Sequence, residues 1–407
     1  MIWFVAWRNI WRNRTRSLII MSAIVIGIFA GTFSAAVLKG MMEQRVQNVI
    51  NLELSHIQIH NPEYLEIKEM HEYLNNVSEI ALTLDTISEV KAHSERVIVN
   101  SMIASAESGA GVQLFGIDPA KEKQITTMHQ QIVEGNYFDD ARRKSIVLGR
   151  KLAEKLNVKI GSRPVLTFQS IDGVLVYESF KVVGIYETVN STYDEMHAFV
   201  LKNDLLSITH IDDDAAHEIA ILLHSNDMTK PVKRKLKAAF PSADIQSWTD
   251  LSPEMSVVTK GMEFSMYIFI GIILLALLFS IINTMLMVVL ERTKEIGMLM
   301  SVGMSRLRVF FMILLESVYL SGFAGVIGIA IGYGTAMLTA RSGIDLSALY
   351  GQGLRSFGYD PVMYPDITPE MALHITIMVL ITGIVASIVP ARRALKLKPA
   401  EAIRTDM

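Results

Sequence analysis

The sequence contains no cysteine and comparatively little charge, and each of these excludes a class of protein. Without cysteine the chain forms no disulfide framework, zinc–thiolate site or iron–sulfur cluster. Charged residues make up 19% of the 407 residues and hydrophobic residues 51%, against about 25% and about 45–50% in soluble proteins. There is also no Gly-Lys dipeptide, which the phosphate-binding loop of many ATPases requires. We therefore expect neither a wholly soluble enzyme nor a chain that hydrolyses ATP itself.

Motifs for metal or nucleophilic catalysis are also missing. The sequence has no His-Glu-x-x-His, and its ten histidines are scattered. His56 and His60 share one face of an expected edge strand, where we interpret them as surface residues. Gly109-Ala-Gly111 precedes a strand rather than a helix and is interpreted as a turn. Because these motifs are missing, we predict no catalytic residue and no metal site. Basic residues are not grouped with aromatic ones in a soluble domain, so we also predict no nucleic-acid partner.

Four apolar stretches are long enough to cross a hydrocarbon core about 30 Å thick, which needs about 20 residues in a helix. They cover residues 18–38, 264–290, 309–340 and 371–389. The first two carry no charge, the third contains Glu316 and the fourth contains His374. A basic segment before the first stretch also fits a cleaved signal peptide, but its apolar run is longer than such peptides usually have. We therefore predict four transmembrane helices.

The segment 39–263 between the first two spans is too long for a loop and predicts a large domain of mixed α+β type. Alternating residues predict strands, including 55–60, 145–149 and a hairpin formed by 174–177 and 180–186. Helices are expected at 64–75, 150–156, 203–208 and 228–239, the last with a solvated basic face.

Basic residues beside the spans are concentrated on one side of the membrane, and the loop 341–370 holds only Arg341 and Arg355. Segments 1–17, 291–308 and 390–407 together hold 13 basic and 4 acidic residues, whereas 39–263 holds 23 basic and 32 acidic ones. By the positive-inside rule both termini and the loop 291–308 face the cytoplasm. The domain 39–263 and the loop 341–370 then lie outside.

The first 17 residues place Trp3, Trp7 and Trp11 on one helix face, with arginines between them. This pattern is typical of a helix lying in the headgroup region, although a basic anchor with incidental aromatics would look the same.

The loop 291–308 is unusually apolar for a short connection. Glu291 and Lys294, like Arg292 and Glu295, are oppositely charged pairs three residues apart, which favours a helix. Gly303 can end that helix, and Ser305 can cap the third span. Such a helix is either a docking surface for a partner or lies in the lipid interface. The candidate docking residues are Glu291, Arg292, Lys294, Glu295, Ile296, Gly297, Leu299, Met300 and Gly303.

Three stretches of the sequence resemble those of a known family: ERTKEIGMLMSVGMSRLR (291–308), AWRNIWR (6–12) and PARRALKLKPAEAIR (390–404). They resemble the FtsX-like permeases of ABC transporters, with 264–400 as the permease domain. GRKLAEKLNVKIG (149–161) and FKVVGIY (180–186) resemble the MacB-type periplasmic domain. The resemblance implies a bacterial inner-membrane permease that works as a homo- or heterodimer. Separate ATPase subunits would dock on the loop helix and hold ATP-Mg, and this chain would bind no cofactor itself.

Within this family the sequence looks most like the lipoprotein-releasing, Lol-type (LolC/LolE) permeases, from its organisation and the stretch around HIQIHNPEY (56–64). This implies lipoprotein cargo and a periplasmic carrier. The alternatives are an efflux permease for peptides or drugs with a tunnel partner, and a non-transporting, FtsX-like transmitter of force to a cell-wall hydrolase.

Two further features concern the spans. An acid such as Glu316 is costly inside a membrane unless it is paired, and we expect Arg306 or Arg308 to reach it. Gly27 and Gly31, and likewise Gly328 and Gly332, are spaced for close helix packing at a dimer or intrachain seam.

Overall fold

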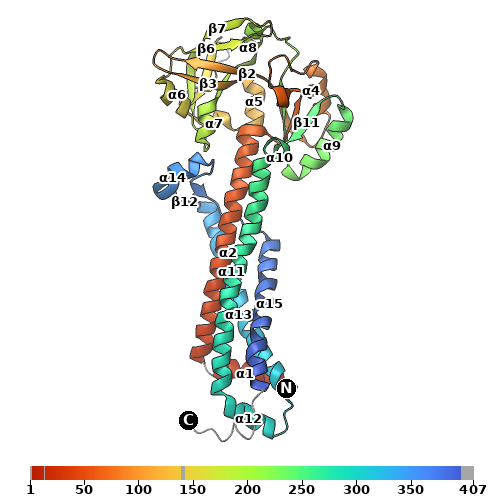
Figure 1. Ribbon diagram of the computed structural model, residues 1–407, viewed down its shortest axis with the longest axis vertical. Coiled ribbons are helices and arrows are strands. Elements are labelled where there is room, and N and C mark those ends of the chain that lie inside the picture. The colour runs from red at the N-terminus through yellow and green to blue at the C-terminus, as the bar shows by residue number, and fades with distance from the viewer. Residues whose placement is uncertain (1, 13, 139–142, 396–407) are drawn as a thin grey trace. The chain divides into compact units, whose positions relative to one another are not determined.

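The computed structural model describes residues 2–12, 14–138 and 143–395 (Figure 1). Contacts between residues divide the chain into two compact units. The helical unit contains Met1–Met42, Thr259–Asp345 and Val362–Met407, and the α/β unit contains Glu43–Val258 and Leu346–Pro361.

The helical unit is built from long helices with a short two-stranded sheet. Its elements are α1 (Ile2–Arg12), α2 (Arg14–Asn48), α11 (Pro253–Glu291), α12 (Thr293–Ser301), α13 (Arg306–Ser342), β12 (Ile344–Asp345), β13 (Val362–Met363) and α15 (Pro369–Leu395). Within the described residues, α2, α11, α13 and α15 are long and apolar enough to cross a membrane. The chain is therefore a membrane protein with four long apolar helices and a large α/β domain between the first and the second.

One continuous apolar core holds the helical unit together. Each long helix contributes a buried stripe to it, for example Ile24 and Ile28 from α2 and Leu274 and Ile281 from α11. Apolar side chains on the opposite faces of these helices stay exposed, as expected for surfaces that meet lipid rather than water.

The α/β unit is a mixed sheet covered by short helices. Its helices are η1 (Val49–Leu54), α3 (Tyr64–Ile67), α4 (Val77–Asp85), α5 (Pro119–Ile125), η2 (Met128–Gln130), α6 (Arg150–Leu156), α7 (Ser191–Met196), α8 (Lys202–Thr209), η3 (Asn226–Met228), α9 (Thr229–Ala239), α10 (Trp248–Leu251) and α14 (Ser347–Ser356). Its strands are β1 (Ile57–His60), β2 (Val90–Ala104), β3 (Gly109–Ile117), β4 (Ile132–Gly135), β5 (Ser145–Gly149), β6 (Val165–Gln169), β7 (Leu175–Ser179), β8 (Lys181–Tyr186), β9 (His197–Leu201), β10 (Glu218–Leu223) and β11 (Asp244–Ser247). The strand order is β11-β1-β10-β2-β3-β9-β5-β8-β4, with β6 paired to β2 and β7 to β6.

Strand β2 joins two parts of this sheet. Its first half pairs with β10 up to Arg96, and its second half pairs with β3 from Val97 onward. Arg96 lies at that junction and is fully buried with two carboxylates. Its Nη1 donates to Glu218 Oε1 at 2.6 Å, and its Nη2 donates to Glu122 Oε1 at 2.7 Å. Separate apolar cores lie on the two sides of this buried ion cluster.

Several local predictions for this domain were wrong. The expected hairpin does not form, because β7 pairs with β6 whereas β8 pairs with β4 and β5. The helix expected at 64–75 ends after Ile67, where Lys68 adopts a left-handed conformation. Gly109-Ala-Gly111 lies within strand β3 and is not a turn.

The two paired histidines were also misplaced by the sequence analysis. Strand β1 is not an edge strand, because it lies between β10 and β11, and both His56 and His60 are buried. His60 Nδ1 lies 3.1 Å from the carbonyl oxygen of His217, and His60 Nε2 lies 3.0 Å from Gln58 Oε1.

Candidate functional site

The loop between α11 and α13 contains the expected short helix, α12. The helix α11 ends at Glu291, and Thr293 marks the turn into α12, where its hydroxyl donates to the carbonyl of Leu290 at 2.7 Å. The helix ends at Ser301, and Gly303 follows with a φ of 104°, a conformation that favours glycine. Ser305 occupies the N-cap position of α13, although its side chain makes no capping hydrogen bond.

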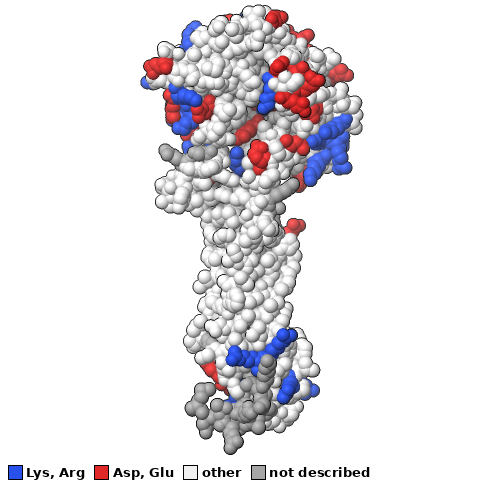
Figure 2. Space-filling view, in the orientation of Figure 1, with Lys and Arg blue, Asp and Glu red and all other residues white. Residues whose placement is uncertain are grey.

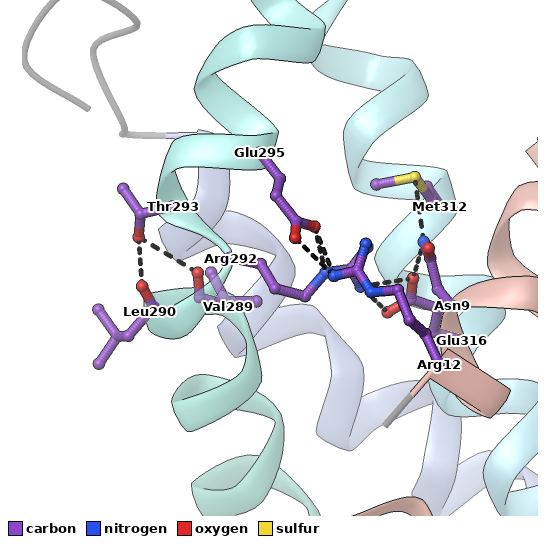
Figure 3. A network of polar contacts seen from close by, with 9 residues as sticks. All are labelled: Asn9, Arg12, Val289, Leu290, Arg292, Thr293, Glu295, Met312 and Glu316. Carbon is purple, nitrogen blue, oxygen red and sulfur yellow. Dashed lines mark hydrogen bonds and ion pairs between the residues drawn. The ribbon is translucent and has the colours of Figure 1, made fainter. Parts of the chain in front are cut away.

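Glu316 is the buried acid around which three elements meet (Figure 3). Its side chain is 5% exposed. Arg292, between α11 and α12, donates from Nη1 to both carboxylate oxygens at 3.0 and 3.2 Å. Asn9 of α1 donates from Nδ2 to Oε1 at 2.6 Å. The expectation that Arg306 or Arg308 would reach Glu316 was wrong, because the cation comes from the other end of the loop.

A second acid closes these contacts into a ring. Arg292 Nε also donates to Glu295 Oε2 at 3.1 Å. Arg12 Nη2 donates to both Glu295 oxygens at 2.6 and 2.7 Å. Asn9 and Arg12 lie one turn apart on α1, so the chain of contacts returns to its starting helix. We call Asn9, Arg12, Arg292, Glu295 and Glu316 the polar ring (Figure 3).

The two ion pairs of the ring differ in strength because they differ in exposure. Arg292 is 16% exposed beside the buried Glu316, so removing either partner would leave an uncompensated charge in a dry setting. Arg12 and Glu295 are 54% and 45% exposed, which places their pair among the weak surface ion pairs. Partial burial opposes ionisation of Glu295, but hydrogen bonds from Arg12 and Arg292 outweigh it and lower the pKa of its carboxyl group. The ring therefore combines an inner pair that is costly to break with a weak outer pair.

The structure separates the candidate docking residues of α12 into two faces. Ile296 is 2% exposed and Gly297 is buried, and Ile296 belongs to the core of the helical unit. Arg292 and Glu295 point into the polar ring, and Leu299 and Met300 are half-buried. Glu291, Lys294, Met298 and Gly303 are exposed.

The sequence analysis selected neither Met298 nor Val302, and Val302 is among the most exposed apolar residues of the chain at 84%. Together with Glu291, Lys294 and Met298 it follows helical spacing along one side of α12. We call these four residues the outer face of α12. It presents two apolar side chains beside two charges.

Asn9 and Arg12 are the site residues that sequence reasoning missed. They are separated from Glu316 and Glu295 by about 300 positions, so no local pattern connects them. The available signals were an amide and a cation three residues apart on the helix before the first span and a lone acid in the third span. The tryptophans of the same helix are placed differently from one another. Trp7 packs against Tyr319 and Phe323 of α13, whereas Trp3 and Trp11 are largely exposed.

All four glycines expected to allow close packing lie at seams within this chain. A Cβ added at Gly27 would lie 2.9 Å from the Leu277 side chain of α11, and Gly31 faces Ile273. On the other side of α2, Gly328 and Gly332 of α13 face Ile28 and Thr32 of α2. Helix α2 therefore packs closely against both α11 and α13 at these positions.

Nothing in the part of the chain that the structure describes groups three or more His, Asp or Glu residues as a metal would need. The geometry around α12 is that of a braced surface helix and not of a reaction centre.

Two protein families match this chain, and several known proteins are similar to it. The family described as FtsX-like permease C-terminal matches residues 267–399, and the MacB-like periplasmic core domain matches residues 17–239. The chain is 23% identical to an uncharacterized ABC transporter permease, MJ1507, of Methanocaldococcus jannaschii over 98% of this chain and 97% of that protein. It is 24% identical to the uncharacterized ABC transporter permease YknZ of Bacillus subtilis over 98% of both chains.

A further relative has a more specific name. The lipoprotein-releasing system transmembrane protein LolC of Xylella fastidiosa is 22% identical over 83% of this chain and 82% of that protein. Among solved structures, the periplasmic region of MacB from Actinobacillus actinomycetemcomitans is similar with a TM-score of 0.36 and 13% identity. It covers 52% of this chain and 98% of that one.

Proposed function

Because the chain belongs to the FtsX-like ABC transporter permeases that carry a MacB-like periplasmic core domain, we propose that its outer face of α12 receives the motion of a separate ATPase. The sequence contains no Gly-Lys dipeptide of a phosphate-binding loop, so in this proposal a separate subunit hydrolyses ATP. The motion then reaches α13 through the polar ring and the α/β unit through α2 and α11. The single observation that carries this proposal is the bracing of an exposed apolar helix face by a largely buried ion pair.

The physical reasoning starts from what a force-receiving helix needs. A partner surface gains affinity from apolar side chains that it buries, and Met298 and Val302 supply them on α12. A push on this helix is useful only if the helix does not slide over the spans. Ile296 anchors α12 in the apolar core, and Arg292 ties its N-terminal end to Glu316.

We further propose that the chain lies in the bacterial cytoplasmic membrane with both termini and α12 in the cytoplasm. The basic residues beside the spans support this orientation. ATP-Mg would be bound by the partner ATPase, and a second permease protomer would complete the transporter.

For the cargo we propose lipoproteins, released toward a periplasmic carrier. Two observations support this choice. One relative named as a lipoprotein-releasing transmembrane protein aligns over most of its length. The spans themselves, as bounded from the sequence, contain only Glu316 and His374 as acidic or basic residues, and Glu316 is engaged in the polar ring. An aqueous path would need more polar lining, so a cargo held at the membrane surface fits better.

The docking step is tested with charge substitutions on the outer face of α12. Met298→Asp with Val302→Asp should weaken recovery of the ATPase with the purified permease by about tenfold or more, as for loss of interface hot spots. Val174→Asp is the matched control, because Val174 is a similarly exposed apolar residue in the α/β unit. Full recovery of the ATPase with the double variant would contradict docking on this face.

The cargo needs its own experiment. The permease and its ATPase would be reconstituted in proteoliposomes with a labelled lipoprotein, and ATP-dependent release would be measured with carrier present. Release supports the proposal. ATP turnover without release would instead favour an export substrate or force transmission to a hydrolase.

A further inference from the structure

Helix α9 concentrates positive charge in an otherwise acidic part of the chain. The segment 39–263 contains 23 basic and 32 acidic residues. Within its 11 residues α9 carries Lys230, Lys233, Arg234, Lys235 and Lys237 and no acid. Figure 2 shows the resulting blue patch on the right-hand side of the α/β unit, over α9. A cluster of cations in an otherwise acidic domain is a candidate binding site for an anionic ligand.

The arrangement of these cations follows from how α9 packs. Val232 and Leu236 are fully buried and hold one side of the helix against the sheet. Lys230, Arg234 and Lys237 fall on the opposite side at spacings of four and three residues, and all three are exposed. They therefore form a single cationic stripe along the helix.

Acids nearby neutralise only the flanks of this stripe. Lys233 Nζ pairs with Asp250 at 2.6 Å, and Lys235 pairs with Glu89. Asp227 lies in the turn before the helix. These two ion pairs hold α9 in place and leave the stripe of Lys230, Arg234 and Lys237 facing outward.

Contacts tie α9 to the segment that leads into a span. Asp250, the partner of Lys233, belongs to α10, and α11 begins at Pro253. Trp248 of α10 donates from Nε1 to Asn226, just before α9, at 2.9 Å. From Pro253 to Phe264, where the apolar part of α11 begins, a helix rises about 16 Å. Contacts therefore hold α9 to the segment just before α11, whose apolar part begins only 11 residues after Pro253.

We propose that the stripe of Lys230, Arg234 and Lys237 binds the headgroups of anionic phospholipids in the leaflet that α11 enters. Each cation near an anionic surface contributes roughly a fivefold gain in membrane association. Three together hold this edge of the α/β unit against the bilayer. The inference needs only that α11 crosses the membrane, and it does not rest on the proposed function.

The experiment uses the full chain and its lack of cysteine. Ala238→Cys, at an exposed position on α9, gives one site for an environment-sensitive fluorophore. The labelled chain is reconstituted in vesicles of phosphatidylcholine, alone or mixed with phosphatidylglycerol, that contain a lipid with a quencher on its headgroup. We expect quenching in the mixed vesicles and a severalfold smaller effect in the neutral ones. Salt at about 1 M should remove it, since the Debye length then falls to about 3 Å.

Variants decide whether the stripe is responsible. Lys230→Gln, Arg234→Gln and Lys237→Gln together should abolish the difference between the two vesicle types. Lys68→Gln, Lys159→Gln and Arg163→Gln remove three exposed cations elsewhere in the unit and should leave it intact. Unchanged thermal unfolding of both variants would show that the fold is preserved. Equal quenching in both vesicle types, or quenching that survives in the α9 variant, would overturn the proposal. The proposal would also be overturned if the label stayed unquenched in the mixed vesicles while the α9 cations were needed to bind an acidic protein.

Discussion

At the scale of single residues, Glu316 shows how an acid is tolerated inside a span. Its carboxylate receives three hydrogen bonds from Asn9 and Arg292 and is almost completely buried. A buried ion pair contributes little compared with an apolar pair of similar size, yet breaking it by removing one partner is costly. We therefore predict which variants are least stable, and not that the ion pair itself stabilises the protein.

Arg292→Met alone should destabilise the protein by about 3–5 kcal/mol, because Glu316 then remains charged and unpaired. Arg292→Met with Glu316→Met should recover much of this loss. Arg12→Met, which breaks the exposed pair, should cost less than about 1 kcal/mol. Thermal unfolding in detergent measures all three. A double variant as unstable as Arg292→Met would show that the charge of Glu316 is not what makes that variant unstable.

Two buried histidines make the α/β unit sensitive to mild acid. The backbone N–H of Leu223 donates to His56 Nδ1 at 3.2 Å, and that of Ile98 donates to His217 Nδ1 at 3.1 Å. Burial, with smaller effects of Lys91 on His56 and of His60 on His217, lowers the pKa of each imidazole to about 4. The unfolded chain therefore binds protons from about pH 6.5 downward while the folded chain does not. The stability associated with these groups is full above pH 6.5 and is lost as the pH falls toward 4.

At pH 5.5 the loss should be about 1 kcal/mol per histidine. His56→Gln with His217→Gln keeps an acceptor at each position and should reduce the decline of the unfolding temperature between pH 7 and pH 5. Part of the decline should remain, because burial also lowers the pKa of His60 and of His197. Glu95 does not interfere in this window. Burial opposes its ionisation, but hydrogen bonds from His93 and Lys121 lower its pKa to about 2, so its contribution fades only below pH 4.5. An equally steep decline in the double variant would refute the assignment.

At the scale of elements, the seam between α2 and α13 depends on a missing side chain. A Cβ at Gly328 would lie 2.9 Å from the Cβ of Ile28 and 3.1 Å from the carbonyl oxygen of Val25. Gly334, six residues further along α13, has open space around it. Gly328→Ala should therefore lower stability by about 1–3 kcal/mol through overpacking. Gly334→Ala should be neutral or stabilising, since alanine favours helix by about 1 kcal/mol over glycine. Equal unfolding temperatures for the two variants would contradict a tight seam.

Elements with a strong local signal could be predicted from the sequence. The four apolar runs became α2, α11, α13 and α15, and β5, α6, α8 and α9 lie within a residue or two of their expected bounds. Partner choice could not be predicted, because an alternating strand fits any neighbour. Strands β7 and β8 lie next to each other in the sequence but pair with β6 and with β5 and β4.

The same limit applies to the site. Local charge spacing correctly indicated a helix near 291–303, but its burial depends on spans far away in the sequence. Ile296 looked like a docking residue because it is apolar and lies in a loop, yet it is part of the core. A charge at Ile296 would therefore disturb folding rather than docking, whereas Met298 and Val302 test docking directly.

At the scale of the whole molecule, two helices pass from one unit to the other without interruption. Helix α2 extends to Asn48, beyond the boundary at Met42, and α11 begins at Pro253, before the boundary at Thr259. Motion imposed on α12 therefore has two continuous helical connections to the α/β unit. In the mechanism that we propose, the polar ring makes α12 move the spans instead of slipping over them.

The most direct measurement compares ATP hydrolysis and lipoprotein release in the same proteoliposomes. The permease reconstituted with its ATPase should show both activities, and the permease alone should hydrolyse no ATP. With Arg292→Met and Glu316→Met together, the outer face of α12 is intact but its ionic link to α13 is gone. ATP hydrolysis should then persist while release falls at least severalfold. Release at the unmodified rate in that variant, or ATP hydrolysis by the permease alone, would contradict the account.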